Sequence, residues 1–238
     1  MTKKYIQILV ASMVVLLNIA IVAIFKVDIT LSNGDIDSSI KTHTIVIDAG
    51  HGGRDGGVVG RSTGVKESDV NLEIALILER LLIERGCTVV MTRSNQDGLY
   101  GDAKVNRKRK DLKYRKDTII QADPSLVISI HQNSFVRSPE RGAQVFYGYA
   151  KSNNNAKDIA TNIQYCLNTT LPECDRTIKQ GNFYILKCTQ YPSILIECGF
   201  LSTPAEEILL IQPDYQTKIA RAIVQGVQQY FDTSQVQT

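Results

Sequence analysis

The sequence predicts an α/β fold: a single three-layer domain in which helices flank a mostly parallel, twisted sheet, preceded by an N-terminal transmembrane or signal-anchor helix. Short apolar runs typical of buried strands alternate along the chain with longer segments that carry apolar residues at helical spacing. The 238 residues, 43% of them hydrophobic, are enough for one packed core beside an anchor. These observations exclude a disordered chain and favour one folded domain.

Residues 1–27 are predicted to form an uncleaved signal anchor. The apolar run from Tyr5 to Phe25 has about the length that spans a bilayer, whereas the apolar part of a cleaved signal is usually about 7 to 15 residues long. Two lysines precede the run and one follows closely, which keeps the N-terminus in the cytoplasm and exports the rest of the chain. A cleaved, secreted form is the alternative.

The remaining boundaries follow from composition. Residues 28–43 are polar and rich in Ser, Asn, Asp and Gly, which predicts a linker; the folded domain then spans 44–232 and a short tail spans 233–238.

The elements of the domain are predicted in chain order from their periodicity. Apolar runs predict strands, and apolar residues at helical spacing predict helices, the first of which, "ESDVNLEIALILERLLIERG", stops at Gly86. The predicted strands are 44–49, 87–92, 126–130, 143–147, 183–186 and 193–196, and the predicted helices are 67–86, 107–122, 153–168 and 214–231. Because strands alternate with helices, the sheet is expected to be mostly parallel.

Charge and cysteine content narrow the class of partner. A formal net charge of +3 does not demand a nucleic-acid partner, and the basic run "RKRKDLKYRK" (107–116) is interpreted as a solvated helix face. The chain has no tryptophan, and no aromatic residues are interleaved with its basic ones, so nucleic-acid binding is not expected. The five cysteines form no C-x-x-C pair; Cys166 and Cys174 could form a disulfide in an oxidising compartment, although we do not expect one.

Four residues suited to metal or proton chemistry follow predicted strands or open a helix. His51 follows the first strand within "DAGHGG", His131 follows "LVISI", Glu197 follows "SILI", and Glu67 opens the long helix. Since ligands of open α/β sheets gather beyond the carboxyl ends of the strands, these side chains can converge on one rim. Two imidazoles and a carboxylate suit Zn²⁺, and a separate carboxylate can take a proton from water. A turn histidine and a glutamate favoured by the helix dipole are the structural alternatives.

Several motifs together carry a family resemblance. In order and spacing, "VIDAGHGGRDGG", "GVKESDVNLEIALILERLLIERG", "TR" at 92–93, "SLVISIHQNS" and "PSILIECGFLSTPAEE" resemble the zinc-dependent N-acetylmuramoyl-L-alanine amidases of the amidase-3 type. The match spans nearly everything from residue 44 to 230. The resemblance implies that 44–232 is a catalytic amidase domain.

The resemblance also implies roles for individual residues. The zinc ligands would be His51, Glu67 and His131, and Glu197 would be the general base and then the acid for the leaving amine. Candidates for orienting ligands or substrate are Asp48, Asn133 and Arg115, with a purely structural role for Asp48 equally open. The sequence departs from the common pattern at Gln132, where a small residue is frequent, and at Cys198, beside the proposed base. No ligand is lost.

The implied reaction is hydrolysis of the amide that joins N-acetylmuramic acid to the L-alanine of a peptidoglycan stem peptide. An anchored single domain, and the stretch "GAQVFY", resemble the sporulation-linked subgroup that acts on spore cortex so that muramic δ-lactam can form. The protein would then be exported and anchored to the outer face of the cytoplasmic or forespore membrane. Its expected partners are the glycan strand with its stem peptides and, without an identity, an accessory cell-surface protein.

Three alternatives stay open at this point. A vegetative cell-wall amidase would look much the same, and another zinc peptidoglycan hydrolase could use the same metal set to cut within the stem peptide. A catalytically silent wall-binding protein is disfavoured because all four candidate residues are intact. The segment "QNSFVRSPERGAQVFY" leaves no room for the inhibitory helix that some relatives insert there, so an open site is expected.

Overall fold

The computed structural model describes residues 40, 43–135, 140–148 and 155–235, all within one compact unit, Ser38–Thr238. The predicted anchor at 1–27, most of the predicted linker, and residues 236–238 of the predicted tail lie outside the described residues. Within the described ranges, no helix combines the length and the apolar character needed to cross a membrane. The anchor therefore stays a prediction.

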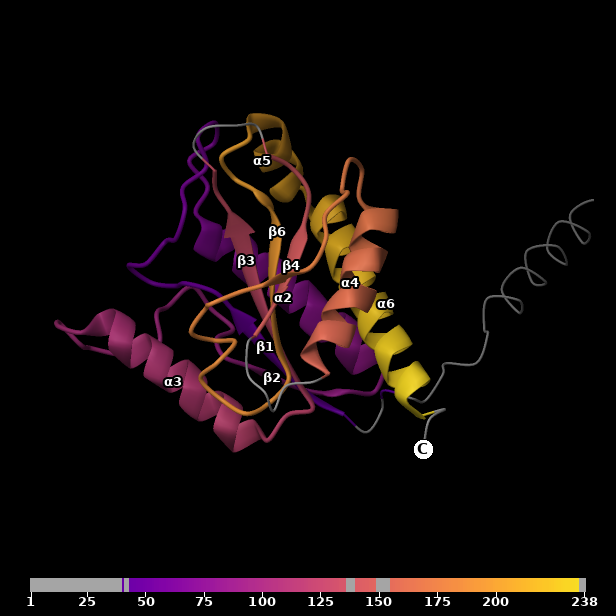
Figure 1. The fold of residues 1–238 in the computed structure, drawn as a ribbon. Coiled ribbons are helices and arrows are strands. Elements are labelled where there is room, and N and C mark those ends of the chain that lie inside the picture. The colour runs from indigo at the N-terminus through magenta and orange to yellow at the C-terminus, as the bar shows by residue number, and fades with distance from the viewer. Residues whose placement is uncertain (1–39, 41–42, 136–139, 149–154, 236–238) are drawn as a thin grey trace, which may run out of the picture. The chain divides into compact units, whose positions relative to one another are not determined.

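Six strands form a single sheet in the order β2-β1-β3-β6-β4-β5 (Figure 1). Every neighbouring pair is parallel except β4 and β6, which run antiparallel. The sheet is thus mixed and mostly parallel, as predicted. The strands are β1 (Thr44–Ala49), β2 (Thr88–Met91), β3 (Leu126–Asn133), β4 (Gln144–Tyr147), β5 (Lys179–Gln180) and β6 (Ser193–Phe200).

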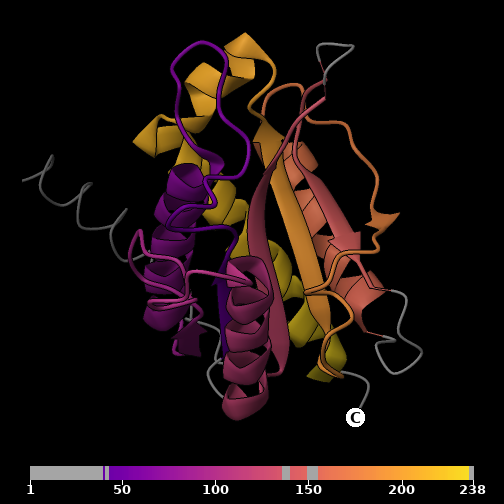
Figure 2. The same ribbon diagram turned by 90° about the vertical axis from the view of Figure 1, so that its left-hand side faces the viewer.

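Helices cover both faces of this sheet and complete the three layers. The pairs α4 with α6 and α2 with α6 pack together on one face, and α3 lies on the other, in front of the strands in Figure 2. The helices are α2 (Glu67–Glu84), α3 (Arg107–Ala122), α4 (Ala156–Thr170), α5 (Pro204–Leu210) and α6 (Pro213–Gln235).

The central strands are uniformly apolar because both of their faces are buried. In β1, every residue after Thr44 is buried, and all eight residues of β6 are buried. Strands covered on both sides read as continuous hydrophobic runs, which is why their positions could be predicted. The larger core cluster includes residues of α2, α4 and α6, and also Ile40, which is fully buried although it falls in the predicted linker.

One predicted strand is wrong. Residues 183–186 form no strand but a turn, in which the Lys187 N–H donates to the Tyr184 carbonyl oxygen at 3.1 Å. Ile185 and Leu186 are buried in the smaller core cluster, beside Ile119 of α3, so burial of a loop produced the apolar run. A short apolar run cannot by itself distinguish a strand from a buried loop.

Other boundaries differ less. Strands β3 and β6 extend to Asn133 and Phe200, beyond the predicted ends at 130 and 196, and β5 and α5 were not predicted. All five cysteines, Cys166 and Cys174 included, are free thiols in the structure.

Candidate active site and metal centre

The loop after β1 is shaped by glycines that leave room for the candidate ligands. His51 adopts the left-handed region with φ 61°, a conformation that is uncommon for a residue other than glycine and typical of functional sites. A Cβ atom on Gly50 would lie 2.3 Å from the ring of His131, and one on Gly57 would lie 2.4 Å from the Glu67 carboxylate. Glycine is therefore required at both positions for the loop to approach these side chains.

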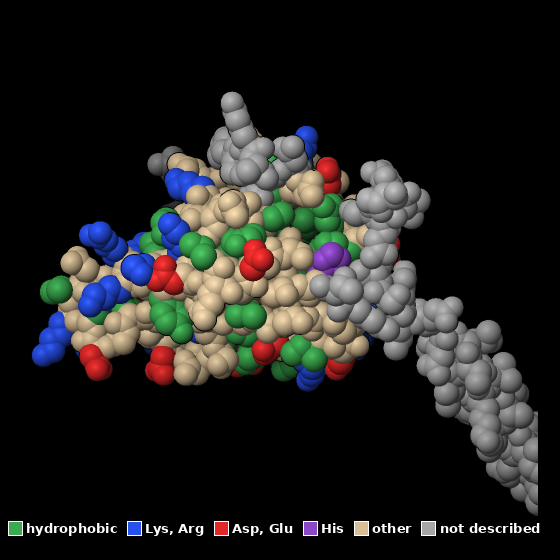
Figure 3. Space-filling view, turned by 90° about the horizontal axis from the view of Figure 1, so that it is seen from below, with side chains coloured by type: hydrophobic (Ala, Val, Ile, Leu, Met, Phe, Trp, Pro, Cys, Tyr) green, Lys and Arg blue, Asp and Glu red, His purple; other side chains and the backbone are tan. Residues whose placement is uncertain are grey.

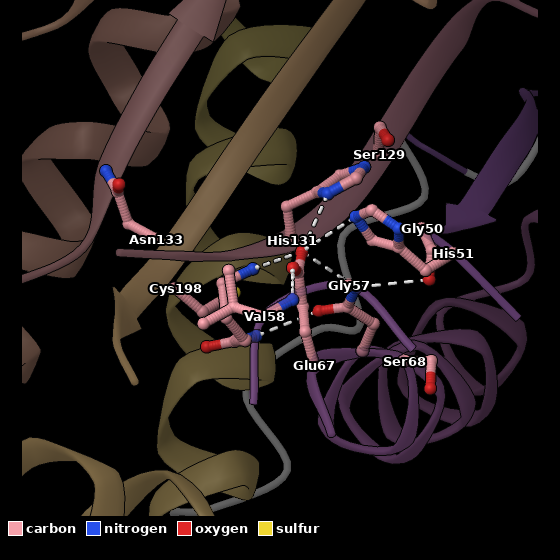
Figure 4. A network of polar contacts seen from close by, with 12 residues as sticks. Gly50, His51, Gly57, Val58, Glu67, Ser68, Ser129, His131, Asn133 and Cys198 are labelled. Carbon is pink, nitrogen blue, oxygen red and sulfur yellow. Dashed lines mark hydrogen bonds and ion pairs between the residues drawn. The ribbon is translucent and has the colours of Figure 1, made fainter. Parts of the chain in front are cut away.

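Three of the predicted residues converge at this loop. His51, Glu67 and His131 each offer a ligand atom, and these atoms all lie within 4.8 Å of one another. Glu67 Oε1 is 2.9 Å from His131 Nδ1 and 3.3 Å from His51 Nε2. Figure 4 shows the two rings and the carboxylate pointing toward one another from the β1–α2 loop, the start of α2 and β3. This group could hold a metal ion.

Glu67 is fixed at the centre of the group by backbone and side-chain donors. Its Oε2 accepts from the Val58 N–H at 2.9 Å, and its Oε1 accepts from the Gln132 N–H at 3.1 Å and from Asn71 Nδ2 at 3.4 Å. Burial opposes ionisation, but the hydrogen bonds and charge of His131 and His51 hold the pKa of Glu67 well below its ordinary value. A buried carboxylate is thus available to a cation.

The same environment raises the pKa of His51. Burial alone would lower its pKa, but Glu67 and Asp55 raise the pKa of His51 to about 9. A proton on His51 therefore competes with a metal cation, because metal binding requires the neutral ring. Two imidazole nitrogens and one carboxylate oxygen form a donor set typical of catalytic zinc sites, so the residues present fit such an ion.

Glu197 lies beside this group on the neighbouring strand. In the register of β3 and β6, His131 is paired with Glu197. The side chain is 8% exposed, and its Oε2 has no hydrogen-bond partner among the described residues. Burial raises the pKa of Glu197 to about 7, which suits a group that takes up and releases a proton near neutral pH. Glu197 and the three candidate ligands line one cavity of about 900 Å³.

Asp48 and Arg115 form a buried ion pair beneath the loop. Arg115 Nη1 donates to Asp48 Oδ1 at 2.6 Å, and the same carboxylate accepts from the hydroxyls of Thr92 and Ser129. Arg115 also donates from Nη2 to the His51 carbonyl oxygen at 2.6 Å. Burial alone would raise the pKa of Asp48, but Arg115 and Ser129 lower it to about 2. The pair therefore positions the backbone of His51, and neither residue belongs to the group of three candidate ligands.

The third residue predicted to orient the site is not part of this group. Asn133 ends β3 and lines the cavity, but its Oδ1 accepts from the Ser134 N–H at 2.7 Å. In Figure 4 it lies apart from His51 and His131.

Two positioning residues were missed by the sequence analysis. Arg93, of the "TR" motif, is buried and donates to the carbonyl oxygens of Ala49, Gly50 and Ser68. Asn71 donates to the Gly50 carbonyl oxygen at 3.1 Å and accepts from Gln132 Nε2. The available signal for Asn71 was its position as a polar residue among the apolar residues of α2. In the structure its side chain is 0% exposed.

Comparisons with known proteins identify the family of the chain. The chain matches Amidase_3, the family described as N-acetylmuramoyl-L-alanine amidase, over residues 45–229. It is 39% identical over 191 residues to the germination-specific N-acetylmuramoyl-L-alanine amidase of Bacillus subtilis (strain 168), with 79% of each chain covered. It is 34% identical over 196 residues to N-acetylmuramoyl-L-alanine amidase LytC of the same strain, covering 82% of this chain and 37% of LytC.

Solved structures show the same fold. The CwlD amidase from Clostridioides difficile, determined in complex with the GerS lipoprotein, has a TM-score of 0.76 at 37% identity, covering 80% of this chain and 99% of that chain. An N-acetylmuramoyl-L-alanine amidase from Clostridium difficile 630 has a TM-score of 0.72 at 32% identity, covering 81% and 98%. The resemblance carried by the motifs is confirmed, and the chain belongs to the Amidase_3 family of N-acetylmuramoyl-L-alanine amidases.

Proposed function

We propose that this enzyme hydrolyses the amide between N-acetylmuramic acid and the L-alanine of peptidoglycan stem peptides, with zinc held by His51, Glu67 and His131 and with Glu197 as the proton carrier. The observation that carries the proposal is the convergence of three ligand atoms within 4.8 Å beside a buried carboxylate whose Oε2 has no partner among the described residues. Both features line the same cavity.

The chain's own residues would divide the chemistry. When bound, Zn²⁺ would polarise the amide carbonyl and acidify a water molecule. Glu197 accepts the proton of the attacking water and then donates it to the leaving nitrogen of L-alanine. Asn71 and Gln132 hold Glu67 in place, and Arg115 holds the carbonyl oxygen of His51, so that the ligands are oriented before substrate arrives.

We further propose that the enzyme acts on spore cortex, in the maturation that leads to muramic δ-lactam. The similarity to a germination-specific amidase supports this role. An exported protein, anchored at the outer face of the cytoplasmic or forespore membrane through residues 1–27, would meet that substrate. The similar CwlD amidase was solved in complex with a lipoprotein, which supports an accessory partner at the membrane surface for this chain as well.

The test compares full-length enzyme in mild detergent with a Glu197→Gln variant on purified cortex peptidoglycan. Wild type should bind about one zinc per chain and release peptides that begin with L-alanine, identified by mass. Glu197→Gln preserves the shape of the side chain but cannot carry the proton, so it should bind zinc equally and lose about 10²- to 10⁴-fold in rate.

Each alternative has a distinct result. Cleavage within the stem peptide, leaving L-alanine on the glycan, would show a peptidase. Zinc binding with full activity in Glu197→Gln would remove Glu197 from its role while leaving the family assignment intact. Equal activity on vegetative and cortex peptidoglycan would argue against the spore-specific role.

A further inference from the structure

The active-site cavity continues beyond the candidate metal centre toward α3. Its lining includes the start of α3, through Arg107 and Lys108, and the loop residue Arg54. A second cavity of about 780 Å³ runs along the same helix and shares Arg107, Lys108 and Tyr184 with the first. A substrate held at the metal centre can therefore extend along the N-terminal half of α3.

We call Arg54, Arg107 and Lys108 the cationic wall. Among the residues that the structure describes, none of the three has a carboxylate within 4.0 Å. Arg107 is fixed by a bond from its Nε to the Ala103 carbonyl oxygen at 2.8 Å, which leaves its terminal nitrogens free of that contact. Figure 3 shows Lys and Arg side chains gathered on the side of the molecule that α3 forms.

Two of the acidic residues that line the same cavity, Asp111 and Asp55, already have partners. Asp111 contacts Arg115 Nε at 2.6 Å and accepts from the Leu99 N–H at 2.8 Å. Asp55 lies 3.0 Å from His51 Nδ1. Along α3 the charge is predominantly positive, because the second cavity is lined by one carboxylate, Asp117, and by five basic side chains, those of Arg107, Lys108, Arg109, Lys113 and Lys116. This part of the groove therefore presents net positive charge to a ligand. The segment 182–185 adds no charged side chain to the lining.

We infer that the cationic wall binds free carboxylates of the stem peptide, so that the peptide leaves the metal centre along α3. This inference rests on the proposed function. The amide to be cut joins a neutral N-acetylated sugar chain to a peptide that carries several carboxylates. Only the peptide side matches a positively charged groove, and arginine and lysine are the side chains that pair with carboxylates.

The expected effect of each residue is moderate. The wall is open to solvent, which makes its ion pairs weaker than those of a buried site. Charge-assisted hydrogen bonds in a partly enclosed groove offset part of this weakening. Removing one charge should weaken binding of the acidic peptide about three- to tenfold, and the effect should shrink as salt is added.

The experiment uses zinc-loaded full-length protein and two synthetic muropeptides. One carries a free carboxylate on each acidic residue of its stem peptide, and the other carries amides at those positions. Calorimetry gives Kd on a Glu197→Gln background, which prevents cleavage, and kinetics with Glu197 intact give kcat and KM. The variants are Arg107→Gln and Lys108→Gln. Lys110→Gln is the matched control, because Lys110 is an exposed residue of α3 that lines neither cavity.

The inference predicts weaker binding of the acidic muropeptide by both wall variants, unchanged binding of the amidated one, and wild-type behaviour in Lys110→Gln. Equal effects on the two muropeptides, or none on either, would overturn it. Cleavage of both muropeptides with no discrimination would remove the subsite and leave the amidase function standing. Charge-dependent binding with no release of peptide by the intact enzyme would support the subsite and refute the proposed amidase function.

Discussion

Replacing Arg115 by methionine should destabilise the domain and weaken metal binding together. The change removes the partner of Asp48, which is 2% exposed, and the donor to the carbonyl oxygen of His51. Methionine fills a similar volume, so lost packing contributes little. The site would keep a buried carboxylate whose remaining side-chain donors are two hydroxyls, those of Thr92 and Ser129.

The magnitude follows from two independent arguments. Breaking a buried ion pair by removing one partner typically costs about 3 to 5 kcal/mol. The depressed pKa of Asp48, about 2 against an ordinary 3.8, corresponds to roughly 2 kcal/mol from that group alone. We expect a loss of about 3 to 5 kcal/mol in the free energy of unfolding, within the stability of an ordinary domain.

Urea unfolding of residues 28–238 at several pH values measures this loss. Because the folded pKa of Asp48 lies below its unfolded value, its contribution is complete above about pH 4 and is lost as pH falls toward 2. The difference between wild type and variant should therefore narrow over that interval. In a double-mutant cycle with Asp48→Asn, the two losses should be strongly non-additive. A loss below about 1 kcal/mol, or simple additivity, would refute the reasoning.

Three further predictions concern the candidate metal ligands. In the metal-free protein, the stability that charged His51 contributes should be complete below its ordinary pKa of 6.5 and be lost as pH rises through about 9. Zinc uptake at neutral pH should accordingly release about one proton from His51, seen by calorimetry in two buffers of different ionisation enthalpy; equal heats would contradict this. Gly50→Ala should weaken zinc binding more than tenfold, because its Cβ would lie 2.3 Å from the His131 ring, whereas Gly56→Ala meets only a flexible lysine side chain and should bind zinc normally.

The central strands and the candidate ligands could be predicted because each has a local signal. Buried parallel strands are continuous apolar runs. His51 comes two residues after the end of β1, and His131 comes directly after the apolar run of β3, inside that strand. The carboxyl ends of parallel strands meet at one edge of the sheet, so adjacency in space followed from position in the chain. Glu197 was located in the same way, although β6 continues past it to Phe200.

The positioning residues had no comparable signal in the residue pattern: the family resemblance implied a role for Arg115, and Arg93 was missed. Arg93 and Arg115 act on carbonyl oxygens of the β1–α2 loop from 43 or more positions away in the chain. Charged residues in a basic helix or after a strand are usually solvated, so the sequence favoured an exposed face for 107–116. In the structure Arg115 is 3% exposed, because that helix lies against the sheet with one arginine turned inward.

The sequence by itself determined the alternation of strands and helices, the four candidate residues for metal binding and proton transfer, and the family, since all of these depend on local period and on motifs. Only the tertiary structure decided that β4 enters the sheet antiparallel, that 183–186 is a loop with Ile185 and Leu186 buried, and that Asp48 pairs with Arg115. The physical reason is that residue patterns encode burial and period, whereas strand direction and the partner of a buried charge depend on how distant segments pack.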